Sequence, residues 1–240
     1  VYERESITVA ELKEILNTSE STIRRDIITL DKEGRLTKVF GGAIALHPAQ
    51  IVNKELSMVQ KQELQTTEKQ AIARYAASLI EPDDCVYLDA GTTTGWMIEY
   101  IRQEKATYIT NALSHAKRLA DKGFNVILIG GEPKSSTDAI VGGEAVLNLQ
   151  KYHFSKGFFG VNGIDRLSGF TTPDVKEAVV KQAAVKNTQP AHRYFLTTSS
   201  KFGEVYAVTF AGFEGGTILT EDNVSEVLPK SIEIINVTQQ

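Results

Sequence analysis

The feature that most constrains the fold is an apolar run that ends in a turn rich in glycine and threonine. Val86-Tyr87-Leu88 has the composition of a buried strand, residues 89–95 form the turn, and 96–101 have the pattern of a helix. A strand that passes through such a turn into a helix leaves backbone N–H groups and hydroxyls aimed at one point. The sequence therefore predicts an anion-binding cradle at residues 91–94.

Length and composition are consistent with one large and one small globular domain, since a domain commonly has ~150 residues. The chain has 240 residues, of which 42% are hydrophobic and 23% are charged, and its formal net charge is −4. Its single cysteine, Cys85, excludes an intrachain disulfide and suits a reducing cytoplasm. No apolar run approaches the ~18 residues of a membrane span, and no signal-peptide pattern opens the chain. We therefore expect a cytoplasmic protein with no membrane partner.

From Cys85 onward, short β-type runs alternate with helical runs, which is typical of an α/β sheet. The predicted strands are 85–89, 107–110, 125–129, 157–161, 194–198, 205–209, 217–219 and 232–237. Polar turns follow several of them, at 89–94, 110–111, 130–131, 160–165 and 199–201. Because ligands bind outside the carboxyl ends of the strands in open α/β sheets, these turns together predict one polar pocket.

Each of these signals alone also has a simpler explanation. Residues 130–131 can be an ordinary turn, Asp165 can cap a turn, and Lys201 can be a surface lysine. Glu177 and Lys181 lie four residues apart on a predicted helix and can be an exposed ion pair. Their convergence favours a ligand, because threonines, backbone N–H groups and lysines suit a phosphate, while carboxylates and amides suit sugar hydroxyls.

The first 46 residues have a different pattern. Thr8 and Glu11 fit a capping box that opens a short helix ending at Leu16. After a turn, Ser19 can cap a second helix over 20–30, on which positions 23, 27 and 30 form an apolar stripe. Two short helices joined by a tight turn, with hydroxyls and arginines on the free face of the second, are typical of a helix-turn-helix that reads the major groove of DNA.

A β-hairpin is predicted to follow at 34–46, turning at the glycine pair 41–42, with basic side chains that can reach the DNA backbone. The candidate DNA-contacting residues are Ser19, Ser21, Thr22, Arg24, Arg25, Arg35 and Lys38. The alternative is a small helical dimerisation module with solvated arginines, and residues 1–46 carry seven Lys/Arg against eight Asp/Glu, a net charge of −1. The clustering of basic residues between 24 and 38 favours DNA.

The sequence between these two patterns is polar and rich in glutamine, without a strong period, from residue 47 to 67. A helical pattern follows at 68–80. We therefore expect a DNA-binding domain at 1–46, a linker at 47–61 and an α/β domain at 62–240.

The motif Ser-Glu-Ser-Thr-Ile-Arg-Arg-Asp-Ile at 19–27, with Gly-Gly-Ala at 41–43, resembles the signature of DeoR-type bacterial transcriptional regulators. The later motifs match in order as well, so the resemblance covers nearly the whole chain. It implies a winged helix-turn-helix, of which residues 1–4 would be only the tail of the first helix, followed by an α/β domain that resembles ribose-5-phosphate isomerase and senses a sugar phosphate. Family members usually carry an arginine about eight positions before the lysine that matches Lys69; here that position is Lys61, and no role is carried over to it.

The resemblance implies a repressor of sugar uptake or catabolism genes that leaves its operator when a phosphorylated sugar, such as a ketohexose phosphate, binds. A homodimer or homotetramer is expected, because two-fold symmetric operators need half-sites at a fixed spacing. No cofactor, metal or catalytic residue is expected. The candidate effector-binding residues are Asp89, Gly91, Thr92, Thr93, Thr94, Asn111, Gly130, Gly131, Asn162, Asp165, Glu177, Lys181 and Lys201.

The main alternative is an enzyme that isomerises a phosphorylated sugar, which needs a carboxylate base and groups that stabilise an enediolate. Where the related isomerases have an Asp-Gly-Ala-Asp loop, this chain has Asn-Gly-Ile-Asp at 162–165, so an amide replaces the first acid. The lysine of those enzymes is also missing from residues 167–172, although Glu177 keeps one acid. These differences favour binding without turnover. A sensor of another phosphorylated metabolite stays open, whereas a dinucleotide site does not fit the spacing at 91–95.

Overall fold

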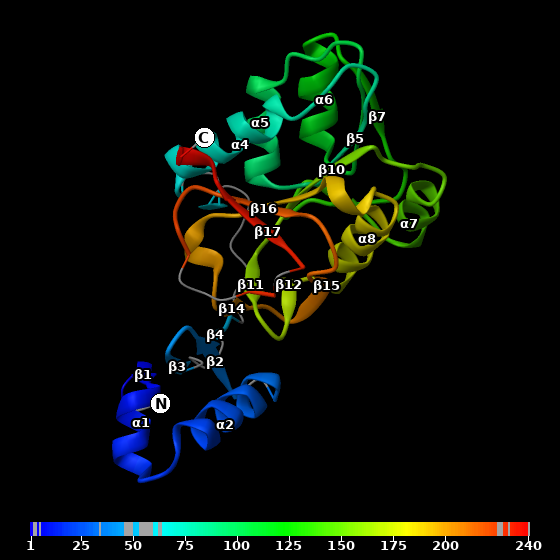
Figure 1. Ribbon diagram of the computed structural model, residues 1–240. Helices are drawn as coiled ribbons and strands as arrows, with labels where there is room; N and C mark the ends of the chain where they lie inside the picture. The colour runs from blue at the N-terminus through cyan, green and yellow to red at the C-terminus, as the bar shows by residue number, and fades with distance from the viewer. Residues whose placement is uncertain are drawn as a thin grey trace. The chain divides into compact units, whose positions relative to one another are not determined.

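The computed structural model describes residues 1, 4, 6–33, 35–45, 50–52, 60–61, 64–224, 228–229 and 231–239. The chain forms two compact units, Val1–Ala49 and Gln50–Gln240. In Figure 1 the first unit is blue, and the second runs from cyan to red.

The first unit is a winged helix-turn-helix, as the sequence predicts. Its elements are β1 (Ser6–Thr8), α1 (Val9–Leu16), α2 (Glu20–Lys32), β2 (Leu36–Val39) and β3 (Gly42–Ala45). The three strands form an antiparallel sheet in the order β1-β3-β2. A small core of Val9, Ile23, Ile27, Leu36 and Ala43 joins the helices to this sheet.

Both predicted helix caps of the first unit are present. Thr8 and Glu11 form the reciprocal capping box of α1, and the Ser19 hydroxyl accepts the Thr22 N–H at 3.2 Å at the start of α2. The helix α2 runs two residues beyond the predicted end, and Leu30 is only partly buried. The hairpin turns at Phe40 and Gly41, where Gly41 has a φ of +83°. The strand β1 was not predicted, and positions 34 and 46 of the expected hairpin lie outside the described residues.

The second unit is built on a seven-stranded sheet in which every neighbouring pair of strands is parallel. This arrangement confirms the α/β prediction, and the strands lie within two residues of the predicted bounds. Across the sheet they are β17 (Glu233–Asn236), β16 (Thr217–Thr220), β13 (Arg193–Leu196), β10 (Lys156–Gly160), β5 (Cys85–Leu88), β6 (Thr107–Thr110) and β7 (Asn125–Leu128).

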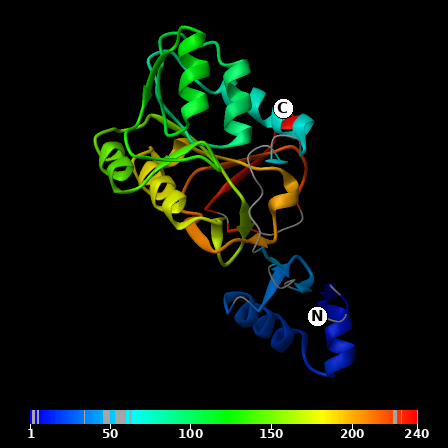
Figure 2. The same ribbon diagram turned by 180° about the vertical axis from the view of Figure 1, so that it is seen from behind.

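Helices cover both faces of this sheet (Figures 1 and 2). One face carries α4 (Thr66–Ser78), α5 (Thr92–Tyr100) and α6 (Leu113–Asp121), and the other carries α7 (Gly143–Leu149) and α8 (Val175–Lys186). Side chains alternate along each strand, so in β5 Val86 and Leu88 pack under α4 and α5, whereas Tyr87 packs on the side of α7 and α8. Short 3₁₀ turns are η1 (Pro190–His192), η2 (Ser199–Lys201) and η3 (Val237–Gln239).

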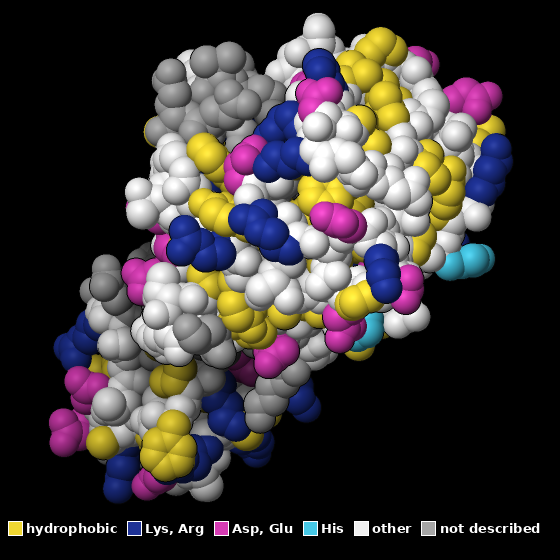
Figure 3. All heavy atoms as spheres, turned by 90° about the horizontal axis from the view of Figure 1, so that it is seen from above, with side chains coloured by type: hydrophobic (Ala, Val, Ile, Leu, Met, Phe, Trp, Pro, Cys, Tyr) yellow, Lys and Arg dark blue, Asp and Glu magenta, His cyan; other side chains and the backbone are white. Residues whose placement is uncertain are grey.

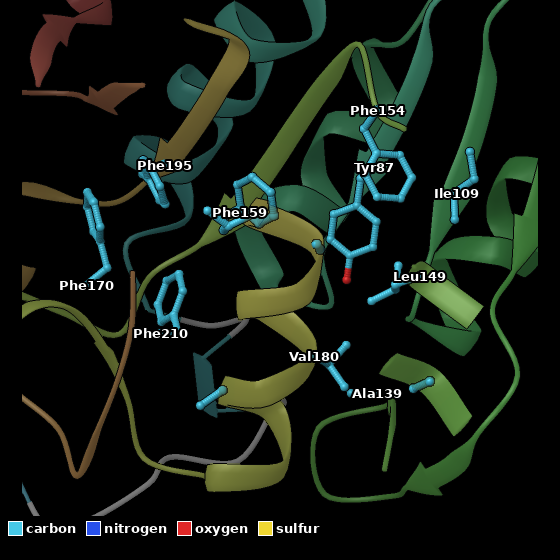
Figure 4. Packing of buried hydrophobic residues seen from close by; sticks show 14 of the residues in the cluster. Tyr87, Ile109, Ala139, Leu149, Phe154, Phe159, Phe170, Val180, Phe195 and Phe210 are labelled. Carbon is cyan, nitrogen blue, oxygen red and sulfur yellow. The ribbon is translucent and has the colours of Figure 1, made fainter. Parts of the chain in front are cut away.

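Aromatic side chains fill the core on the α8 side of the sheet (Figure 4). Ring centroids are 5.7 Å apart for Tyr87 and Phe159, 5.7 Å for Phe159 and Phe195, and 3.9 Å for the stacked pair Phe195 and Phe170. Phe170 and Phe210 come from a second, smaller sheet, so this row of rings fixes the small sheet against the main one.

The small sheet is one of three additions that the sequence did not predict. It is antiparallel and consists of β11 (Gly163–Asp165), β12 (Gly169–Thr172) and β15 (Val208–Ala211). The others are a hairpin of β8 (Glu132–Lys134) with β9 (Ala139–Val141) and a parallel pair of β14 (Glu204–Val205) with β4 (Gln50–Ile51). The prediction of one strand at 205–209 is wrong, because the chain leaves β14 and turns into β15 of the small sheet. A Cβ at Gly163 would lie 2.3 Å from the Glu204 carbonyl oxygen, so this close approach requires glycine.

Most of the predicted linker, 47–61, lies outside the described residues. Its described part includes residues 50–51, which form β4 and belong to the second unit. Among the described helices, none has the length and apolar character needed to span a bilayer.

Candidate functional site

A cleft lies at the point of the main sheet where the chain changes the side on which it adds successive strands. From β5 the chain continues to β6 and β7 on one side, and from β10 it continues to β13, β16 and β17 on the other. The chain therefore leaves the carboxyl ends of β5 and β10 in opposite directions, which is where open α/β sheets bind ligands. Residues 90–93 and 160–162, which follow these two strands, line an open cleft of about 870 Å³ including its mouth.

The cradle predicted at 91–94 forms the first turn of α5. The helix begins at Thr92 rather than near residue 96, and Gly91 precedes it in an extended conformation with no side chain capping the helix. The Thr94 hydroxyl donates to the carbonyl oxygens of Asp89 (2.6 Å) and Gly91 (3.0 Å), and this contact fixes the turn. Gly91, Thr92 and Thr93 line the cleft. The positive end of the helix dipole and the backbone N–H groups of the first turn are therefore available to an anion.

A buried ion pair forms the floor of the cleft. Oδ2 of Asp89, at the end of β5, accepts the Gly160 N–H at 3.0 Å and pairs with the Lys181 ammonium, which also donates to the Gly160 carbonyl at 3.0 Å. Burial raises the pKa of Asp89, and the contacts with Lys181 and Gly160 oppose that shift. The pair ties the ends of β5 and β10 to α8. Both charges are thus largely used within the protein.

Glu177 brings a carboxylate to the cleft from α8. Its Oε1 accepts hydrogen bonds from the Lys134 ammonium at 2.9 Å and the Thr137 hydroxyl at 2.5 Å, and Asp174 caps the helix by accepting the Glu177 N–H. These contacts hold the β8–β9 hairpin against α8. Since both side-chain bonds use Oε1, Oε2 has no hydrogen-bond partner among the described residues and can accept from a ligand.

Sequence reasoning missed Lys69, a buried lysine of α4 that lines the cleft. Its Nζ donates to the carbonyl oxygens of Lys61 and Leu64, the latter at 2.7 Å. Burial, followed by repulsion from Lys201 and Lys61, lowers the pKa of Lys69 from 10.5 to about 8. Among the described residues, no carboxylate forms an ion pair with it. By sequence alone Lys69, next to Glu68 in a helical pattern, has the pattern of a solvated lysine. Its only other signal was that it matches a lysine of the family that the chain resembles.

The thirteen predicted effector residues fall into three groups. Seven line the cleft: Gly91, Thr92, Thr93, Asn162, Glu177, Lys181 and Lys201. Asp89 lies beneath them in the floor. Five do not line the cleft: Thr94, Asn111, Gly130, Gly131 and Asp165.

Four of the five residues outside the cleft have identifiable structural roles, that of Thr94 being in the turn before α5. Asn111 is buried, and its Oδ1 accepts from the Tyr87 hydroxyl at 3.0 Å and the Ala90 N–H at 2.9 Å. Asp165 accepts the N–H groups of residues 167 and 168, so it caps a turn. Gly131 has a φ of +147°, and a Cβ there would lie 2.7 Å from the Val141 carbonyl oxygen. Asn111 therefore supports the cradle from behind, while the other two shape neighbouring turns.

The candidate DNA-contacting side chains lie on the exposed surface of the first unit. Arg24 and Arg25 on α2 have side chains that are 57% and 77% exposed, and Arg35 beside the hairpin is 69% exposed. Arg24 donates to the Glu20 carboxylate one helical turn before it, and Arg25 lies 3.8 Å from Asp26. Ser19 uses its hydroxyl to cap the helix. Arg25 is therefore the arginine of α2 with the more exposed side chain.

Surface charge elsewhere is mixed. On the face shown in Figure 3, Lys and Arg side chains are interspersed with Asp and Glu, in keeping with a formal net charge of −4. Within the part of the chain that the structure describes, no group of three or more His, Cys, Asp or Glu side chains is arranged to hold a metal ion.

Comparison with known proteins identifies both units. The DeoR-like helix-turn-helix domain matches residues 1–49, and the DeoR C terminal sensor domain matches residues 64–223. The chain belongs to the DeoR family. Like its relatives in this family, it is a transcriptional regulator and not an enzyme.

Two relatives illustrate the similarity to other DeoR-family proteins. The HTH-type transcriptional regulator FruR of Bacillus subtilis is 42% identical, and the match covers 92% of this chain and 87% of FruR. The lactose phosphotransferase system repressor of Staphylococcus aureus is 36% identical over 97% of this chain and 92% of the repressor. Among solved structures, ribose 5 phosphate isomerase A of Neisseria gonorrhoeae is similar with a TM-score of 0.41 and 11% identity, over 60% of this chain and 55% of that chain.

Proposed function

We propose that this DeoR-family regulator represses genes for sugar uptake or breakdown and leaves its operator when a phosphorylated sugar binds in the cleft. The observation that carries the proposal is the cleft itself, which combines, within the part of the chain that the structure describes, a helix terminus without a side-chain cap, a buried lysine without a carboxylate partner and an available carboxylate oxygen. The names of the relatives, a lactose phosphotransferase system repressor among them, support a role in sugar operons.

The distribution of charge in the cleft supports a phosphorylated sugar as the effector. Because α4 and α5 cover the same face of the sheet, Lys69 and the amino terminus of α5 approach the cleft from one side, with Lys201 close to Lys69. A phosphate suits this end. Glu177 approaches on α8 from the opposite face, and its Oε2, with the Asn162 amide, suits sugar hydroxyls. Phosphorylated ketohexoses are the first class to test.

On the DNA side, the proposal assigns the operator contacts to α2 and the hairpin. The hydroxyls of Ser21 and Thr22 and the guanidinium of Arg25 lie on α2 and suit base edges or phosphates. Arg35 and Lys38 suit the DNA backbone. The proposal also includes a homodimer or homotetramer, since paired half-sites need two such helices at a fixed spacing. Light scattering after size exclusion, with and without operator DNA, measures the number of chains directly.

A thermal-shift screen of the full chain tests the effector class. Sugar monophosphates at about one hundred times their Kd are expected to add about 2.7 kcal/mol to the free energy of unfolding, or roughly 5–10 °C in Tm. The matching unphosphorylated sugars are expected to have little effect. The active compounds are then expected to release a fluorescent operator fragment in an anisotropy assay.

Matched variants connect this response to the cleft. Lys69→Met and Lys201→Ala are expected to lose most of the shift in Tm, because each removes a cation at the phosphate end. Lys117→Ala, an exposed residue of α6 whose ammonium pairs with Asp121, is expected to respond as the original chain does. Equal stabilisation by unphosphorylated sugars, or an unchanged response in both cleft variants, would contradict the proposed effector class.

A further inference from the structure

The residue that precedes α4 is fastened to the rim of the cleft. Oε1 of Gln65 accepts hydrogen bonds from the hydroxyls of Thr198 at 2.8 Å and Ser200 at 3.2 Å. Gln65 has a φ of +51°, in the left-handed region that residues other than glycine seldom adopt. Its two side-chain contacts therefore hold a backbone conformation that is otherwise disfavoured.

Lys69, in the first turn of α4, also binds the residues that precede this helix. Its ammonium donates to the backbone carbonyls of Lys61 and Leu64, which precede α4, instead of to a carboxylate. We call Gln65, Lys69, Thr198 and Ser200 the rim clamp. The contacts of Gln65 join the entry of α4 to the loop that carries η2, and those of Lys69 join the same entry to α4 itself.

An anion in the cleft competes for the donors of the rim clamp. The Thr198 hydroxyl has a single hydrogen to donate, Thr198 lines the cleft, and that hydrogen now points to Gln65. The ammonium of Lys69 also lines the cleft, and a phosphate is a stronger acceptor for it than a neutral carbonyl. Binding of a phosphate at this end therefore weakens the attachment of Gln65, Lys61 and Leu64.

The same loop also holds the chain segment that comes from the first unit. The strand β14 begins three residues after Lys201 and pairs with β4, and the Val52 N–H donates to the Val205 carbonyl at 2.9 Å. Residues 198–205 thus carry two cleft-lining side chains and the pairing partner of residues 50–52. A change at Thr198 or Lys201 is therefore three to seven residues from the β4–β14 pairing.

We propose that the rim clamp is the switch of this regulator: it is closed in the operator-binding state, and the phosphate of the effector opens it and loosens the β4–β14 pairing. The inference rests on the proposed function, since it needs an anionic effector in the cleft. A ligand that prefers the open state must bind more tightly once the clamp is weakened by mutation. Variants that weaken the clamp are therefore expected to release operator DNA at lower effector concentrations.

The first experiment titrates the full chain on operator DNA with the sugar phosphate that gives the largest thermal shift. Ser200→Ala removes one contact of the clamp without touching the cleft, because Ser200 does not line it. The effector concentration for half-release is expected to fall about threefold in this variant and about tenfold in Gln65→Met. Ser78→Ala serves as the control with no change, because the Ser78 hydroxyl donates to the Tyr75 carbonyl on α4 and to no other group among the described residues. Half-release at an unchanged or higher concentration in both clamp variants would overturn the switch while leaving the proposed function intact.

The second experiment measures hydrogen exchange of the amides in residues 50–52 and 204–205. Exchange is expected to speed up when the same sugar phosphate, or inorganic phosphate as a second probe, saturates the cleft, and to be fast without ligand in Gln65→Met. Unchanged exchange in a chain whose Tm rises with the ligand would overturn the switch alone. If neither probe raises the Tm, the proposed function and the switch both fail.

Discussion

The protonation of Lys69 is expected to make effector affinity depend on pH. In the ligand-free protein, burial and the neighbouring Lys201 and Lys61 lower the pKa of Lys69 to about 8. A phosphate in contact with the ammonium favours its charged form and moves the pKa back toward the ordinary value. Effector binding therefore takes up a proton wherever Lys69 is neutral in the free protein.

The size of the effect follows from this pKa. Between pH 7 and pH 9 the charged fraction of Lys69 falls from roughly nine tenths to one tenth, so the Kd of the sugar phosphate is expected to rise about tenfold, or ~1.4 kcal/mol. The phosphate itself does not change charge over this range, because its second pKa is about 6. At pH 8, binding is expected to take up about half a proton per effector.

Isothermal titration calorimetry at pH 7, 8 and 9, in buffers of different ionisation enthalpy, measures both quantities. Lys69→Met is the matched control, expected to bind more weakly and with no dependence on pH over this range. A constant Kd for the original chain, or the same slope in Lys69→Met, would refute the assignment of the phosphate to this lysine.

The same pKa predicts the pH dependence of stability without ligand. The unfolded lysine keeps its proton up to about 10.5, whereas the folded one loses it near 8. The unfolded state therefore binds more protons between these values, and stability rises with pH in that window. Denaturant titrations of the original chain and Lys69→Met isolate this contribution as the difference between the two curves, and a difference that does not vary between pH 8 and 10 would contradict it.

Three further substitutions test other parts of the structure. Arg25→Ala is expected to weaken operator binding by about 1–3 kcal/mol in an anisotropy titration while the effector-induced shift in Tm persists; unchanged affinity would remove Arg25 from the interface. Lys181→Met is expected to lower the free energy of unfolding in urea by about 3–5 kcal/mol, because it leaves Asp89 buried without its partner, and Asp89→Leu in the same chain should restore part of that loss. Gly95→Ala places a Cβ 2.8 Å from Nε2 of the buried His115 and is expected to cost about 1–3 kcal/mol; a loss below about 0.5 kcal/mol would argue against this packing.

Elements with local signals could be predicted from the sequence. The capping box of Thr8 and Glu11 and the cap at Ser19 depend on residues three positions apart, and both helices start where these caps predict. The strand at 107–110 has its predicted bounds, because a short apolar run between polar turns is enough to define a buried parallel strand. The start of α5 at Thr92 was missed, since threonine has a low helix propensity. Its first turn is fixed by the hydroxyl of Thr94, which bonds to backbone carbonyls before the helix.

Features that depend on distant pairings could not be predicted. The small sheet joins β12 to β15 across about forty residues, and its rings pack on Phe195 of the main sheet. In the cleft, Asp89 and Lys181 were predicted as separate ligand groups, yet they form one buried pair although they lie 92 residues apart. The burial of Lys69 likewise results from the carbonyls and lysines that tertiary structure places around it. Residue type and spacing contain no information on such partners.

The pairing of charges in the cleft argues for a receptor that is ready for its ligand. A buried ion pair such as Asp89 with Lys181 adds little net stability, but here it holds β5, β10 and α8 in fixed positions. The Oε1 of Glu177 is similarly occupied. Under the proposed function, an incoming phosphate is therefore expected to leave these groups in place and to act on Lys69 and Thr198, whose present partners are the neutral acceptors of the α4 entry. The part of the cleft that an effector can change is thus the part joined through β14 to residues 50–52, an arrangement that suits transmission of a binding event better than chemistry on the ligand.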